Sequence, residues 1–121
     1  MSTRGEFGRE GEALAGRYLE ELGFKILDRS YRCPMGELDI VAMEGDTLVF
    51  VEVKARGSNA YGGPFAAVTR TKQRRLEKAA LSYIKFKGLK PDSARFDVVG
   101  IVAGAVPELL RNAFTPARFT F

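Results

Sequence analysis

The chain has 121 residues, with 19 Lys and Arg against 15 Asp and Glu, which gives a formal net charge of +4. This length suits one domain with a modest core, and the 45% of hydrophobic residues exclude disorder as the main state. No apolar run approaches the ~20 residues that cross a bilayer, and the N-terminus lacks a signal-peptide pattern. We therefore expect a cytoplasmic protein with no membrane partner.

The absence of histidine narrows the chemistry that the chain can perform. It excludes Ser-His-Asp and Cys-His catalysis, and nucleases that use a histidine general base. The single cysteine, Cys33, forms no internal disulfide, and an ordinary zinc site cannot be assembled. Acid–base chemistry would therefore come from Asp, Glu, Lys or Tyr, together with a hard cation held by carboxylates.

The first predicted element is a helix over residues 6–22, preceded by a loose tail at 1–4. Gly23 marks its end, since glycine commonly follows the last helical turn. Glu12 lies at the flank of the apolar stripe, where a solvated carboxylate is the ordinary interpretation. The residues of this stripe recur at helical spacing and are Phe7, Gly11, Leu14, Ala15, Tyr18 and Leu22.

From residue 24 the pattern becomes typical of strands, with an interruption at Pro34 and Gly36. A two-residue turn at Gly45-Asp46 joins the second strand to the third. The third strand is almost continuously apolar, which is typical of a central strand covered on both faces. The three predicted strands span residues 24–31, 38–43 and 48–54.

A Gly/Ser/Asn-rich segment at 56–64 predicts a surface loop, and a second helix follows at 71–87. Thr71 is the predicted N-cap of this helix and Gly88 its C-terminal stop. The side chains predicted to face inward are Leu76, Ala79, Ala80 and Tyr83.

A fourth strand is predicted at 95–102, and residues 106–121 are harder to interpret, with 106–110 as a candidate edge strand. The order α-β-β-β-α-β predicts an α/β fold with a mixed β-sheet and helices on both of its sides. We expect one domain over residues 1–121.

The turn at Gly45-Asp46 also fixes how the second and third strands pair. Asp39 should face Glu52, and Glu37 should face Lys54. Alternation along each strand places all four side chains on one face, with directly opposed Cβ atoms ~4.5–5.5 Å apart. A four-residue loop gives the same pairing, whereas a three-residue loop would destroy the cluster.

Two interpretations of this cluster remain, because opposed like charges destabilise a strand pair. In the first, Lys54 neutralises the acids, one acid is protonated or hydrated, and the cluster has no function. In the second, Asp39 and Glu52 bind a divalent cation, and a few carboxylates completed by water are typical of Mg²⁺. Magnesium suits phosphate chemistry, and Lys54 could orient a water molecule or stabilise charge in the transition state.

Positive charge is concentrated beside this hairpin. Residues 70–90 contain eight Lys and Arg against one Glu, a net +7, while the rest of the chain carries −3. A solvated helix face is the alternative, but next to a magnesium site we favour nucleic acid as the partner. The helix lacks the large apolar face of a membrane-binding helix. The predicted contacts are Arg70, Lys72, Arg74, Arg75 and Lys78, with Arg56 and the following loop added by adjacency to Lys54.

The spacing of Asp39 and Glu52-Val53-Lys54 resembles the motif of the PD-(D/E)XK nucleases, and a wider set of motifs resembles the YraN-like family within that superfamily. The resemblance covers residues 5–114. The single departure is Ser30-Tyr31-Arg32, where Asn is expected before Tyr. The motifs are Gly11–Ala15 with Tyr18-Leu19, Gly36–Val41, Phe50–Arg56, Phe96–Val99 and Asn112–Phe114.

The resemblance implies a restriction-endonuclease-like fold and a metal-dependent endonuclease that hydrolyses DNA phosphodiester bonds. It relates the chain to archaeal Holliday-junction resolvases, which implies branched or structured DNA as substrate, Mg²⁺ or Mn²⁺ as cofactor, and a homodimer by analogy alone. By position, Asp39 and Glu52 would be metal ligands, with the Val53 carbonyl as a third. Lys54 would be the catalytic lysine, and Glu12 would approach the metal from the first helix.

Three further residues are weaker candidates. Glu37 is the third carboxylate of the hairpin, and Gln73 would match a polar helix residue that touches the site in some superfamily members. Asp97 is either an extra site carboxylate or, the interpretation we favour, a partner for a buried arginine. Two alternatives to an enzyme remain: a nucleic-acid-binding or adaptor module on a nuclease fold with little catalysis, and a protein-interaction domain unrelated to nucleic acid.

Overall fold

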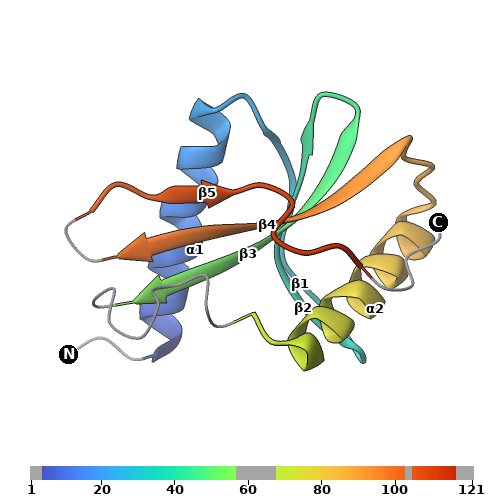
Figure 1. Ribbon diagram of the computed structural model, residues 1–121, viewed down its shortest axis with the longest axis horizontal. Coiled ribbons are helices and arrows are strands. Elements are labelled where there is room, and N and C mark those ends of the chain that lie inside the picture. The colour runs from blue at the N-terminus through green and yellow to red at the C-terminus, as the bar shows by residue number, and fades with distance from the viewer. Residues whose placement is uncertain (1–3, 57–67, 103–104, 117–121) are drawn as a thin grey trace.

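The computed structural model describes residues 4–56, 68–102 and 105–116. Its elements follow the predicted order, with one short strand added at the end (Figure 1). No helix in these ranges is long and apolar enough to span a membrane. The elements are α1 (Arg4–Glu21), β1 (Lys25–Cys33), β2 (Gly36–Glu44), β3 (Thr47–Arg56), α2 (Arg70–Lys87), β4 (Ser93–Val102) and β5 (Glu108–Leu110).

The described strands form one five-stranded mixed sheet in the order β1-β2-β3-β4-β5. β3 and β4 are parallel, with α2 as the connection between them, and the other neighbouring pairs are antiparallel. The candidate edge strand within 106–110 is confirmed, since β5 pairs with β4. The predicted α/β class with a mixed sheet is therefore confirmed.

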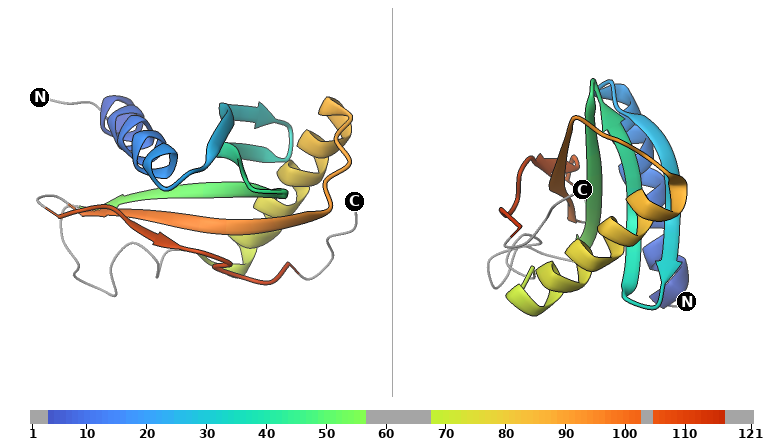
Figure 2. Two further views of the ribbon diagram at one scale, coloured as in Figure 1. Left: turned by 90° about the horizontal axis from the view of Figure 1, so that it is seen from above. Right: turned by 90° about the vertical axis from the view of Figure 1, so that its right-hand side faces the viewer.

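The two helices cover the two faces of the sheet. Alternate residues of β3 divide between two cores: Leu48 and Phe50 belong to the core under α2, and Val49 and Val51 to the core that includes Ala15 and Leu19 of α1. This division confirms β3 as a central strand covered on both faces. In the left view of Figure 2, α1 lies above β3 and β4, while the twisted β1–β2 pair leaves their plane.

The N-cap of helix α2 lies two residues before the predicted one. Thr69, not Thr71, is the N-cap, because its Oγ1 accepts a hydrogen bond from the Lys72 amide (3.2 Å) and its carbonyl accepts one from Gln73 (2.8 Å). The prediction of Gly88 as the stop is confirmed, with φ of 64° and an amide that reaches the carbonyls of the last turn. All four residues predicted to face inward are buried.

Helix α1 ends at Glu21, just before the position where the apolar stripe was predicted to finish. Gly11 and Ala15 are buried, as predicted. The prediction for Leu22 is wrong: it lies in the turn after the helix with 44% of its surface exposed, and Leu19 fills the core in its place. Residues 1–3 of the predicted tail and the side chain of Phe7 lie outside the described residues, and the prediction of a tail is wrong for Arg4, which begins α1.

The hairpin between β2 and β3 has the predicted turn and register. Gly45 adopts φ of 60°, which glycine supports at the first position of a two-residue turn. The strand pairs run from Glu44–Thr47 to Ile40–Val51, and the ladder ends there. The predicted pairs Asp39–Glu52 and Glu37–Lys54 are therefore wrong as ladder pairs, since the two strands separate just before reaching them.

Candidate functional site

The site lies where β2 and β3 separate. Just beyond the last strand pair, the Asp39 side chain links β2 to β3, because its Oδ2 accepts a hydrogen bond of 2.8 Å from the amide of Val53. A carboxylate thus replaces a backbone carbonyl as the partner of a strand N–H group. This bond holds Asp39 against β3 even though Asp39 and Glu52 are not a ladder pair.

Three carboxylates converge at this point. Glu12 from α1 and Glu37 and Asp39 from β2 each offer an oxygen atom, and these atoms lie within 4.8 Å of one another. Ser30 Oγ donates a hydrogen bond of 2.8 Å to Glu12 Oε2, which orients the Glu12 carboxylate. Three negative charges at this separation repel one another, so the arrangement favours a proton or a cation among them.

The pKa of Asp39 is raised first by burial and then by the neighbouring negative charges. Burial, followed by the negative charge of Glu52 and smaller effects of Glu12 and Glu37, raises the pKa of Asp39 from 3.8 to about 8. The Val53 hydrogen bond acts in the opposite direction, because it stabilises the ionised form. At neutral pH and without a cation, Asp39 therefore holds its proton.

Glu52 lies nearby on β3, and two lysines balance its negative charge. It is 8% exposed, and its Oε1 is 3.4 Å from Lys54 Nζ and 3.2 Å from Lys72 Nζ. Burial lowers the pKa of Lys54, the neighbouring Lys72 ammonium lowers it further, and Glu52 opposes both. Glu52 does not belong to the group of three carboxylates within 4.8 Å. The predicted cluster of acids with Lys54 is therefore present, but as two adjoining groups.

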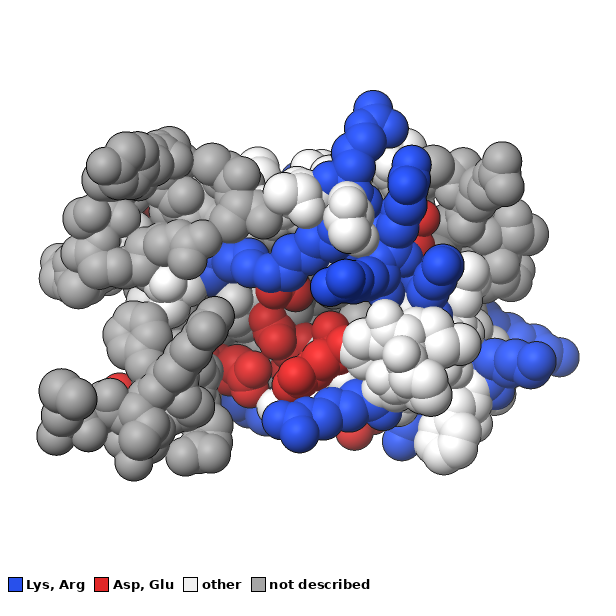
Figure 3. Space-filling view, turned by 90° about the horizontal axis from the view of Figure 1, so that it is seen from below, with Lys and Arg blue, Asp and Glu red and all other residues white. Residues whose placement is uncertain are grey.

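Members of both groups line one cavity of about 460 Å³ between the start of β2 and the start of α2. Figure 3 shows a face of the molecule on which acidic side chains gather between basic ones. Carboxylates inside and cations at the rim suit a metal ion and the phosphate of a polyanion. The lining residues are Gly36, Glu37, Asp39, Glu52, Thr69, Thr71, Lys72, Arg75 and Leu76.

Two of the weaker candidates lie elsewhere. Asp97 is 1% exposed and accepts hydrogen bonds from Arg95 Nε and a terminal guanidinium nitrogen (2.7 and 2.8 Å) and from the Asn112 amide (2.9 Å). The favoured interpretation of Asp97 as a partner for an arginine is thus the one that the structure bears out. Gln73 donates to the Val68 carbonyl (3.2 Å) and lines a separate cavity of about 270 Å³ with Arg70 and Arg74.

The predicted nucleic-acid contacts divide between several places. Lys72 and Arg75 line the cavity, while Arg70, Arg74 and Lys78 lie elsewhere on α2. The side chain of Arg56 and residues 57–64 lie outside what the structure describes, and whether the Val53 carbonyl binds a metal stays a prediction.

Sequence reasoning missed Ser30 and the role of Lys72 inside the site. Ser30 has φ of 51°, and no local pattern links it to Glu12, eighteen residues earlier. Lys72 reaches Glu52 from another element, twenty residues later in the chain. Such contacts can be predicted only when the packing of α1 and α2 on the sheet is known.

Comparison with known proteins gives a consistent family assignment. A model described as "Uncharacterised protein family UPF0102" matches residues 11–101, a range that includes every residue of the cavity. A UPF0102 protein of Desulfosudis oleivorans is 48% identical over 116 residues, which cover 94% of each chain. One of Syntrophus aciditrophicus is 49% identical over 110 residues, covering 88% of this chain and 87% of the relative. One of Geobacter sulfurreducens is 54% identical over 94 residues, covering 78% and 73%.

Proposed function

The chain belongs to the UPF0102 family, and we propose that it is a metal-dependent endonuclease that hydrolyses phosphodiester bonds in branched or otherwise structured DNA. One observation carries the proposal: oxygen atoms of Glu12, Glu37 and Asp39 converge within 4.8 Å, and Glu37 and Asp39 line a cavity together with Glu52 and basic side chains of α2. Nothing in the packing of a small domain requires so many acids at one point, because their mutual repulsion opposes folding.

The donor set fits a hard divalent cation. Glu12, Glu37 and Asp39 offer only oxygen ligands, which Mg²⁺ and Mn²⁺ prefer. Glu52 is the further ligand that the PD-(D/E)XK resemblance implies, and two lysines keep its charge balanced. A bound Mg²⁺ supplies polarisation of a phosphoryl oxygen and a lower pKa for bound water.

The chain's own residues would do the rest of the chemistry. Lys54 projects from β3 next to Glu52, where its ammonium can stabilise the negative charge that develops on a phosphate under attack. Lys72 and Arg75 at the cavity rim can bind the phosphates on either side of the cleaved bond. Ser30 holds Glu12 in place for the cation.

The fold agrees with this proposal. We propose that the fold is restriction-endonuclease-like. It has an aspartate on the second strand and Glu-X-Lys on the third, and a crossover helix then leads to a parallel fourth strand. We also propose that the protein is cytoplasmic and forms a homodimer. Two sites would be needed to cut both strands of a junction.

The direct test is a cleavage assay on labelled linear duplex, single-stranded and four-way-junction DNA, with Mg²⁺, Mn²⁺ or EDTA. We expect cleavage only with a metal, and a loss of about a hundredfold or more in Asp39→Asn and Glu52→Gln. Asp46→Asn is the matched control, because Asp46 is an exposed carboxylate in the β2–β3 turn. Cleavage that survives unchanged in Asp39→Asn would refute the proposal.

A second candidate function follows from the state of Glu52. Its ion pairs with two lysines leave it outside the group of three carboxylates, which favours a nucleic-acid-binding module with little catalysis. This alternative expects DNA binding that weakens steeply with salt and no cleavage with any metal. A protein with no DNA affinity even at low salt would contradict both functions.

A further inference from the structure

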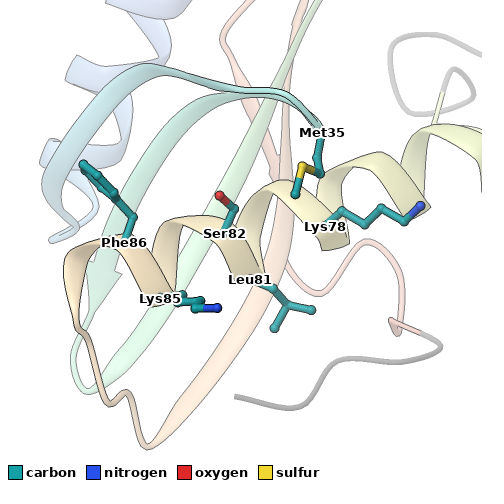
Figure 4. Close-up of a pocket in the computed structure, with 6 residues that line it drawn as sticks. All are labelled: Met35, Lys78, Leu81, Ser82, Lys85 and Phe86. Carbon is teal, nitrogen blue, oxygen red and sulfur yellow. The ribbon is translucent and has the colours of Figure 1, made fainter.

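Another cavity lies on the outer side of α2, away from the acids. It has a volume of about 820 Å³ and is lined by the tip of the β1–β2 hairpin and one face of the helix. In Figure 4, Met35 reaches over the helix at one end, Phe86 stands at the other, and Ser82 lies between them. The lining residues are Met35, Lys78, Leu81, Ser82, Lys85 and Phe86.

Two exposed apolar side chains make this groove unusual. Phe86 has 75% of its surface exposed and Met35 has 47%. An aromatic ring exposed to water adds little to the free energy of folding, and apolar patches with a polar rim commonly mark binding surfaces. The Lys87 ammonium lies 5.8 Å from the centroid of the Phe86 ring, which adds a cation beside it.

The rim of the groove is basic. Lys78 and Lys85 are exposed, and among the described residues no carboxylate lies within ion-pairing distance of either. Two copies of the chain that met through this groove in a symmetric contact would bring these lysines together, which is unfavourable. The charges therefore favour an anionic occupant that also carries apolar surface.

The groove continues the candidate active site. Arg75 lines the acidic cavity, and Lys78, Ser82 and Phe86 follow it at spacings of three and four residues, so they share one face of α2. A Cβ on Gly36 would lie 3.7 Å from the Arg75 carbonyl, so the hairpin packs on α2 where the two cavities meet. From Lys72 to Phe86 the helix rises about 21 Å at ~1.5 Å per residue.

We infer that this groove binds an unpaired segment of a DNA strand, with phosphates on Lys78 and Lys85 and a base stacked on Phe86. Stacking on an aromatic ring combined with cations along the backbone is how proteins hold single strands without reading their sequence. The inference rests on the proposed nucleic-acid substrate and specifies it further: the bound DNA has an unpaired stretch beside the bond that is cut. An acidic protein helix is the competing occupant.

Binding is measured by fluorescence anisotropy in EDTA, so that cleavage does not contribute to the signal. Phe86→Ala should weaken binding of labelled oligothymidylate between about 5-fold and 150-fold, the range of one base–aromatic stack, and leave blunt duplex within about twofold. Phe86→Leu should not restore affinity, because leucine keeps apolar area but has no ring. Val106→Ala is the control, since Val106 is a similarly exposed apolar residue (77%) that lies between β4 and β5 and not on α2.

A spectroscopic readout gives a second test. The chain contains no tryptophan, so Phe86→Trp introduces a single reporter whose fluorescence a stacked base should quench. The inference is overturned if Phe86→Ala leaves oligothymidylate affinity unchanged, as an acidic helix in the groove would predict, or if it weakens duplex equally. It is also overturned if Phe86→Ala converts a dimer to a monomer. Wild-type protein that binds no DNA at all would instead refute the proposed function.

Discussion

The half-buried carboxyl of Asp39 should make the stability of the protein depend on pH. Burial, and then the charge of Glu52, raise the pKa of Asp39 from 3.8 to about 8 in the folded state. The folded protein thus holds this proton more tightly than the unfolded chain does. The stabilisation is complete below about pH 4 and is lost as the pH rises to about 8. The difference corresponds to at most about 6 kcal/mol, because water entry and relaxation reduce it.

A divalent cation should reverse this loss, since it can take the place of the Asp39 proton among the carboxylates. At pH 8, Mg²⁺ at a hundred times its dissociation constant would add about 2.7 kcal/mol to the free energy of unfolding. For a domain of this size that raises the melting temperature by about 10 °C. The Asp39→Asn variant should show neither the decline between pH 5 and 8 nor the Mg²⁺ effect.

The assay is urea and thermal denaturation followed by circular dichroism at pH 5, 6.5 and 8, with and without MgCl₂. Glu44 does not interfere, because hydrogen bonds from Arg111, assisted by Arg95, lower its pKa to about 2 and keep it ionised throughout. Asp46→Asn should behave as the wild type does. If wild type and Asp39→Asn decline in parallel, or if Mg²⁺ leaves the wild-type melting temperature at pH 8 unchanged, the reasoning about this cluster is wrong.

Three other predictions concern single residues. Lys54→Met should lower the cleavage rate about a hundredfold and leave DNA affinity, measured by anisotropy, within about threefold; a loss of affinity alone would make Lys54 a binding residue. Asp97→Ala should cost about 3 kcal/mol in urea denaturation, because it leaves the Arg95 charge partly uncompensated, and the folded variant should cleave at the wild-type rate. Thr69→Ala should cost about 1 kcal/mol and Thr71→Ala clearly less; the reverse order would contradict Thr69 as the N-cap.

The register of the β2–β3 hairpin could be predicted because a two-residue turn leaves no freedom in how the strands pair. Gly45 supplies the positive φ that the turn requires, and the pairs next to the turn follow from it, with Glu44 opposite Thr47 and Met43 opposite Leu48. The length of the ladder could not be predicted in this way. The length of the ladder depends on the twist of β2, whereas a prediction from alternating residues assumes a regular strand.

The structure shows where that regularity fails. Leu38 and Val41 are three residues apart on β2, so strict alternation would place them on opposite faces, yet both belong to the core under α2. The pairing of β1 with β2 also shifts between Ile26 and Asp28, and such irregularities increase local twist. This shift lies opposite Val41 and Ala42, next to the point where the β2–β3 ladder ends, and Asp39 just beyond meets Glu12 through tertiary packing alone.

The charge balance of the site favours two states, one with a proton on Asp39 and one with a bound divalent cation. Among the described residues no buried polar side-chain atom lacks a hydrogen-bond partner. When Asp39 is ionised, the four carboxylates exceed the two ammonium groups of Lys54 and Lys72 by two charges. One proton on Asp39 removes half of this excess, and one divalent cation removes all of it. A phosphate that draws Lys72 away from Glu52 would restore the deficit of positive charge, so substrate and cation should bind more tightly together than either does alone.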